Sequence, residues 1–131
     1  MFGTLTQNGI RNESSAATWQ LGSSITGYDD VGKTVSVNAA ANFTVETKVA
    51  GAEILGYLES YEDRVAEGIK VGAVSWHGCY TFPYTGTAPT PGAHVMCNAA
   101  GGVAVATGTL GLHTIVTSVD TVALTCEVLL K

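Results

Sequence analysis

The chain of 131 residues is long enough for one domain with a substantial core, and a hydrophobic fraction of 46% argues against disorder throughout. Its formal net charge is −5, with six lysines and arginines in all, so we expect no nucleic-acid partner. No apolar run approaches the ~20 residues of a membrane span. Charged residues make up only 13% of the sequence, about half of the usual ~25%, so we expect other polypeptides to cover much of the surface.

The first thirty residues lack the periodicity of the rest of the chain. We interpret residues 1–30 as an extended N-terminal arm with isolated apolar side chains that would anchor in another chain. The proposed anchors are Phe2, Leu5, Ile10, Trp19 and Leu21. Deletion of residues 1–20 is then expected to leave a folded domain. Two alternatives stay open, a leader that packs on its own domain and a frayed tail.

From residue 31 onward the pattern is that of strands. Apolar and polar residues alternate over 34–37 and again over 43–47, with a turn between them. A longer hairpin follows, in which the run beginning at 54 and the run over 71–84 flank a polar link. Prolines 83, 89 and 91 and nearby glycines then form a sharp corner that cannot continue a sheet ladder.

Short strands resume after this corner. They are expected at 93–97, 103–107, 112–119 and 122–130, with a Gly-Gly turn at 101–102. About nine short strands at regular intervals are typical of a sandwich or a closed barrel. The only helix expected is one turn near residues 61–66. We therefore predict an all-β fold, a small antiparallel β-barrel or β-tulip-like domain over residues 31–131.

The histidines and cysteines raise the question of a metal site. His77 and Cys79 share a strand face, but the three-residue spacing of His94 and Cys97 puts them on opposite faces. We therefore expect no metal, no other cofactor and no catalytic cysteine. The N-terminus lacks the pattern of a secretory signal. An odd number of three cysteines (79, 97 and 126) favours a cytosolic chain with free, buried thiols, although one disulfide plus one thiol stays open.

Two further groups of side chains could mark a site. Glu59, Glu62 and Asp63 could suggest acid–base chemistry, but carboxylates at a hairpin end are usually solvated. Aromatic side chains recur at even positions of one predicted strand and therefore share a face. These are Trp76, Tyr80, Phe82 and Tyr84. Core packing is the leading interpretation, with a stacking platform for sugars or bases and a protein–protein face as alternatives.

The order of these segments resembles a known family. The resemblance covers residues 31–131 and depends on a rhythm of strands and glycine turns. Its segments are Gly32-Lys33-Thr34-Val35, residues 54–59 (ILGYLE), 71–84 (VGAVSWHGCYTFPY), 86–95 (GTAPTPGAHV) and 99–103 (AAGGV). The whole is similar to the head decoration, or capsid cement, proteins of tailed bacteriophages.

The resemblance implies a protein without catalytic residues that sits on the outer surface of the phage head. It would be synthesised in the host cytoplasm, form a homotrimer and clamp subunits of the major capsid protein. Two other functions remain open: a carbohydrate- or host-surface-binding β module that uses the aromatic row, and another virion component such as a tail-tube or head-completion protein.

Overall fold

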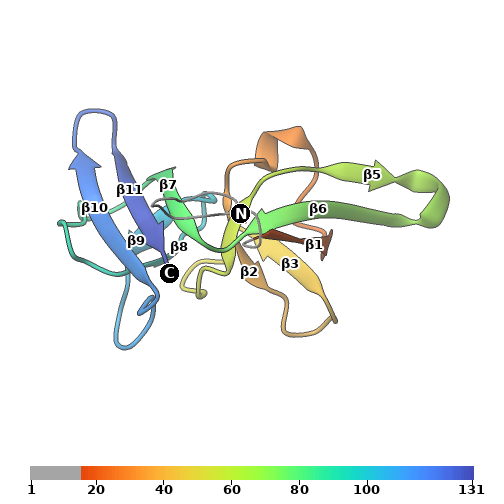
Figure 1. Ribbon diagram of the computed structural model, residues 1–131, viewed down its shortest axis with the longest axis horizontal. Coiled ribbons are helices and arrows are strands. Elements are labelled where there is room, and N and C mark those ends of the chain that lie inside the picture. Colours follow the sequence, from red (N-terminus) through yellow and green to blue (C-terminus); the bar gives the residue numbers. More distant parts are fainter. Residues whose placement is uncertain (1–15) are drawn as a thin grey trace, which may run out of the picture.

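The computed structural model describes residues 16–131, which form two adjoining β structures (Figure 1). The first is a closed barrel of five strands, in the order β1-β3-β2-β4-β6, with β6 paired again to β1. Its strands are β1 (Ala16–Leu21), β2 (Thr34–Val37), β3 (Thr44–Thr47), β4 (Gly56–Leu58) and β6 (Ile69–Ser75). The predicted all-β fold with a small barrel is confirmed. The pairing of β1 with β3 is parallel, whereas the other pairings around the barrel are antiparallel.

The predicted central hairpin is present and supplies two sides of the barrel. Tyr57 of β4 pairs with Ser75 of β6. Nearer the start of β6, Glu62 of β5 (Glu62–Arg64) pairs with Val71 and Arg64 pairs with Ile69. The 3-10 helix η2 (Val65–Glu67) closes the hairpin, which projects from the barrel (Figure 1). The helical turn expected near residues 61–66 therefore lies slightly later in the chain.

The second β structure holds the C-terminal half of the chain. Its three-stranded sheet has the order β10-β11-β7 and lies beside a two-stranded sheet of β8 and β9. These strands are β7 (Gly78–Pro83), β8 (Val95–Cys97), β9 (Val103–Val105), β10 (Thr114–Asp120) and β11 (Thr125–Leu130). The strand expected over 71–84 is interrupted after Ser75, since Gly78 has a φ of 121°, which glycine adopts most readily.

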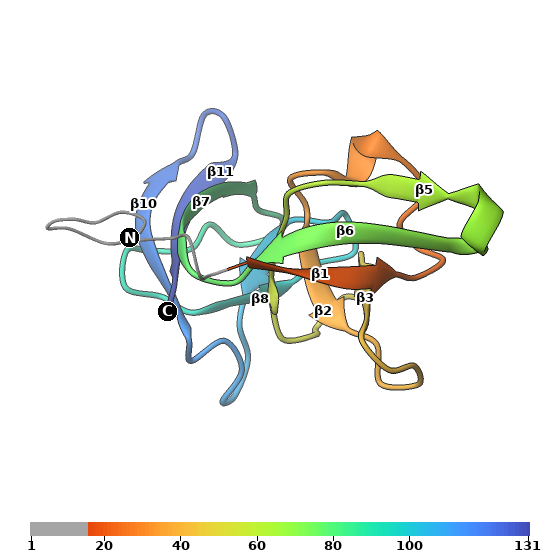
Figure 2. The same ribbon diagram turned by 45° about the vertical axis from the view of Figure 1, so that its right-hand side comes forward.

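The boundary predicted between arm and domain at residue 30 is wrong. β1 pairs with β6 over Ala16 to Gln20 and with β3 at Gln20 and Leu21, so it closes the barrel (Figure 2). Leu21 is buried in the barrel core, and Trp19 packs against the same core. Both are therefore wrong as arm anchors, and deletion through residue 20 would remove a barrel strand. Phe2, Leu5 and Ile10 lie outside the described residues.

The rest of the predicted arm is also tied to the barrel, through two carboxylates. Asp30 ends the 3-10 helix η1 (Tyr28–Asp30) and accepts hydrogen bonds from the backbone N–H of Thr26 (2.8 Å) and from Lys33 Nζ (2.9 Å). Glu46 of β3 accepts the backbone N–H of Ser24 (3.1 Å) and the Asn38 side-chain amide (2.7 Å). These contacts hold residues 22–30 against the strands.

Two apolar clusters form the core. One fills the barrel and the other lies between the sheets of the C-terminal half. The barrel cluster contains Leu21, Ile25, Val35, Val45, Leu58 and Val74. The second contains Ile54, Phe82, Tyr84, Val95, Cys97, Val103, Val116, Cys126, Val128 and Leu130. Buried Thr34 joins the two halves, because its N–H donates to Gly101 O (2.9 Å) and its hydroxyl donates to Gly102 O (2.8 Å).

Candidate interaction surface

The predicted aromatic row is mostly core. Phe82 and Tyr84 are buried, and the half-buried Tyr80 stacks on Tyr57 with ring centroids 4.6 Å apart and planes at 17°. Burial raises the pKa of Tyr80, and its hydroxyl donates to His77 O (3.0 Å). The core interpretation is therefore confirmed for these three side chains, and the stacking platform is wrong for them. Trp76 lies apart from them, in the interruption between β6 and β7, and is 37% exposed.

Trp76 lines a groove at one end of the barrel. We call this the groove end; here β1 and β3 begin, while β2 and β6 finish. Ala16 pairs with Ser75, the residue before Trp76, and Val37 is the last residue of β2. The groove has a volume of about 440 Å³ and a mainly apolar lining. Its walls come from the end of β2, the segment before β4, Trp76, His113 and Lys131. The groove therefore lies where the barrel meets the C-terminal half.

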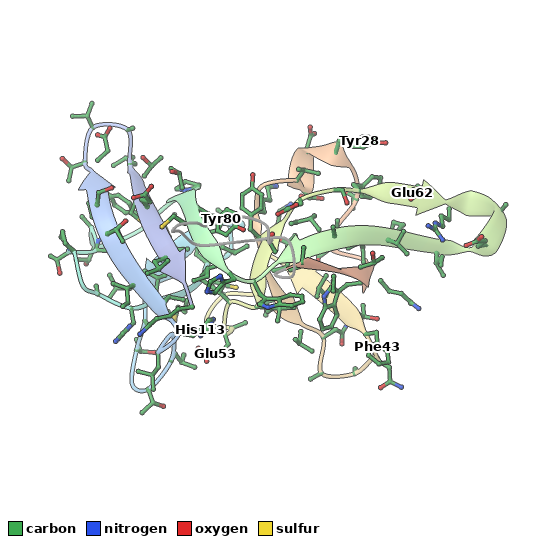
Figure 3. All side chains as sticks on the ribbon, in the orientation of Figure 1. Tyr28, Phe43, Glu53, Glu62, Tyr80 and His113 are labelled. Carbon is green, nitrogen blue, oxygen red and sulfur yellow. The ribbon has the colours of Figure 1, made fainter. Side chains whose placement is uncertain are left out.

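Hydrogen bonds hold the polar side of this groove in place. Glu53 Oε1 accepts the backbone N–H of Gly111 (2.5 Å), and His113 Nε2 lies 2.5 Å from Ile54 O, to which it donates. Figure 3 shows Glu53, His113 and Phe43 on the same lower side of the molecule. Since the lining residues come from distant segments and Glu53 and His113 are held by hydrogen bonds, the mainly apolar groove can accept an apolar segment.

Further along the groove end, Phe43 is unusual in both exposure and backbone. Its side chain is 78% exposed, and its φ of 52° lies in the left-handed region, which costs a bulky residue about 1–2 kcal/mol. Its carbonyl accepts the N–H of Gln20 (2.9 Å), the first hydrogen bond between β1 and β3. Together with Val37, which is 54% exposed, Phe43 presents apolar surface to solvent where β2 turns into β3.

A second exposed apolar group lies in the turn between β10 and β11. Val122 is 93% exposed and Leu124 is 55% exposed. Asp120 Oδ1 accepts the N–H groups of Val122 and Ala123 (both 3.0 Å), so the turn is ordered by its own side chain. The sequence pattern had assigned residues 122–124 to a strand. A turn was expected at Asp120 and Thr121, between the two strands, and the structure extends it through Leu124.

All three cysteines are free. Cys97 and Cys126 are buried as predicted, and burial raises the pKa of the Cys97 thiol to about 11. Cys79 is exposed, so that prediction is wrong, because odd positions of β7 face outward while Tyr80 and Phe82 face the core. His94 Nδ1 lies 2.6 Å from Thr114 O. Within residues 16–131, no three His, Cys, Asp or Glu side chains gather to hold a metal ion.

The carboxylates of the central hairpin belong to its solvated surface. Glu59, Glu62 and Asp63 are all exposed, as the solvated interpretation predicted. Arg64 Nε lies 3.2 Å from Glu62 Oε2, and Ser75 Oγ donates to Glu59. Glu59 and Glu62 therefore pair with Ser75 and Arg64 rather than with another carboxylate.

No protein-family model matches the sequence, and no curated protein matches it. Among the residues that the structure describes, no helix is long and apolar enough to cross a membrane.

Proposed function

We propose that this protein is a capsid decoration protein of a tailed bacteriophage. It binds the outer surface of the head as a homotrimer and stabilises contacts between subunits of the major capsid protein. The observation that carries the proposal is the exposure of large apolar side chains at two separate places, one on the barrel and one on the C-terminal sheet, of a weakly charged protein. The resemblance of residues 31–131 to the decoration family supports the same conclusion.

Two exposed apolar surfaces suit the two contacts that such a protein makes. One contact is with copies of itself and the other is with the shell. The two surfaces lie at opposite ends of β10. The groove end includes His113, just before this strand, and the turn with Val122 and Leu124 comes just after it. We assign the turn to the shell and the groove end to self-association.

Attachment of this kind works through several modest contacts. Burial of apolar surface is worth about 25 cal/mol per Å² before the costs of association are subtracted. A single β10–β11 turn presents few apolar side chains, so it binds weakly alone. A trimer brings three turns to the shell at once, and the second and third contacts form at high effective concentration.

The test is binding to heads assembled without the decoration protein. Val122→Asp puts a charge where the shell contact is proposed, so we expect binding at least ~10-fold weaker than wild type. Thr87→Asp adds the same charge at another exposed position and should bind like wild type. Binding is read from co-sedimentation with the heads.

Two results would refute the proposal. Wild-type protein that does not sediment with heads excludes decoration. Wild-type protein that forms hexameric rings by itself supports a tail-tube component instead. Equal binding by Val122→Asp and wild type would remove the β10–β11 turn from the shell contact.

A further inference from the structure

Strand β1 is longer than its pairing with β3. The N–H groups of Gln20 and Gly22 donate to Phe43 O and Val45 O (both 2.9 Å), so even-numbered residues of β1 direct their backbone groups toward β3. By the same alternation, Ala16 and Thr18 direct theirs to that side. The β1–β3 pairing begins only at Gln20. Within residues 16–131, no strand pairs with this edge of Ala16 and Thr18, which is therefore open to an added strand.

A buried donor next to this edge is also without a partner. Trp19 packs against the barrel core, and its indole Nε1 is buried without a hydrogen-bond acceptor. Buried N–H groups are almost always paired, because burial without a partner is unfavourable. Trp19 follows Thr18 in β1 and packs toward the barrel core. The open edge itself, with the backbone groups of Ala16 and Thr18, favours a segment that brings backbone groups to the groove end.

The apolar groove supplies the third feature. Ala16 pairs with Ser75, the residue before Trp76, so the open edge begins beside the groove. An extended segment lying at this end could pair its backbone with β1 while its apolar side chains reach Trp76 and Val37. Main-chain bonds to an open edge, combined with pockets for alternate side chains, are the features of strand addition.

We propose that the groove end binds residues 2–10 of a neighbouring copy of this chain. Residues 2–10 have no charged side chain and include Phe2, Leu5 and Ile10, which suits a mainly apolar groove. The polar sequence Arg11-Asn12-Glu13-Ser14-Ser15 separates them from β1. Six residue steps separate Ile10 from Ala16, a reach of at most about 20 Å, which is long enough for residues 2–10 to extend to a neighbouring copy.

The exchange is head-to-tail when each copy gives its segment to one neighbour and receives a segment from another. Head-to-tail contacts form a ring when the rotation between copies closes. The inference rests on the proposed function only for the expectation that the ring closes at three copies. The docking itself can be measured in solution without heads.

The experiment is a photo-cross-link between isotopically distinct copies. Protein with p-benzoylphenylalanine in place of Leu5 is refolded together with ¹⁵N-labelled wild-type protein and then irradiated. The cross-linked peptides are identified by mass spectrometry. We expect most cross-links to join residue 5 of the unlabelled chain to labelled peptides containing Val37, Leu55 or Trp76. A control with the photo-reactive residue in place of the exposed Thr87 should not label these peptides.

Cross-links found only within one chain would overturn the proposal in favour of a segment that packs on its own domain. Cross-links to other surfaces, or an equal pattern from the Thr87 control, would also overturn it.

A variant lacking residues 1–15 provides a second measurement, and its mass in solution should fall to that of a monomer. Retention of the wild-type oligomer would contradict the proposal. If the cross-linking and deletion experiments fail but the protein still binds heads, the proposed function stands. If they succeed but the protein does not bind heads, only the proposed function is refuted.

Discussion

At the scale of single residues, Asp30 shows how a buried charge stabilises this fold. Burial by itself would raise the pKa of Asp30, but hydrogen bonds from Lys33 and Thr26 and the charges of Lys33 and Lys48 outweigh it and lower the pKa. The folded state therefore prefers the ionised carboxylate. This contribution is fully present above the ordinary pKa of about 3.9 and is lost as the pH falls through the lower folded value.

We predict that Asp30→Asn lowers the free energy of unfolding by about 2 kcal/mol at pH 7, because hydrogen bonds to a charged group are lost. The difference from wild type should shrink as the pH falls below about 4. Urea unfolding at fixed protein concentration between pH 7 and pH 3 measures both effects. Asp29→Asn, at the exposed neighbouring position, should change stability by less than ~0.5 kcal/mol. A pH-independent difference for Asp30→Asn would contradict the assignment.

At the scale of elements, β1 marks the real boundary between the barrel and the segment before it. We predict that deletion of residues 1–15 leaves a protein that unfolds cooperatively. Deletion of residues 1–21 removes β1, including the buried Leu21 and the packed Trp19, and should cost at least about 4 kcal/mol. Circular dichroism during urea unfolding distinguishes the two. Equal stability of the two deletions would show that β1 does not close the barrel.

The strands differ in how far they could be predicted from the sequence. Residues 34–37 and 44–47 alternate beside their own turn, so their pattern was visible locally, and the even positions of β7 were correctly assigned to one buried face. β1 also alternates, but its partners β3 and β6 lie far along the chain. Its Trp19 therefore had no visible neighbours. The groove was hidden for the same reason, since its lining comes from distant segments.

At the scale of the whole molecule, the proposed function assigns the groove end to contacts between copies and the β10–β11 turn to contact with the shell. Thr34 ties the barrel to the C-terminal half through the backbone of Gly101 and Gly102. If the β10–β11 turn meets the shell as proposed, a load on the C-terminal half would be shared with the barrel through this contact. That arrangement suits a protein that reinforces an assembly from outside.

The most direct test of the central claim is the heat stability of heads that lack the decoration protein. DNA release from such heads is followed with a fluorescent dye during heating, with and without saturating purified protein. The account predicts that wild-type protein raises the release temperature and that Val122→Asp, at the same concentration, raises it much less. An unchanged release temperature with wild-type protein bound to the heads would contradict a role as capsid cement.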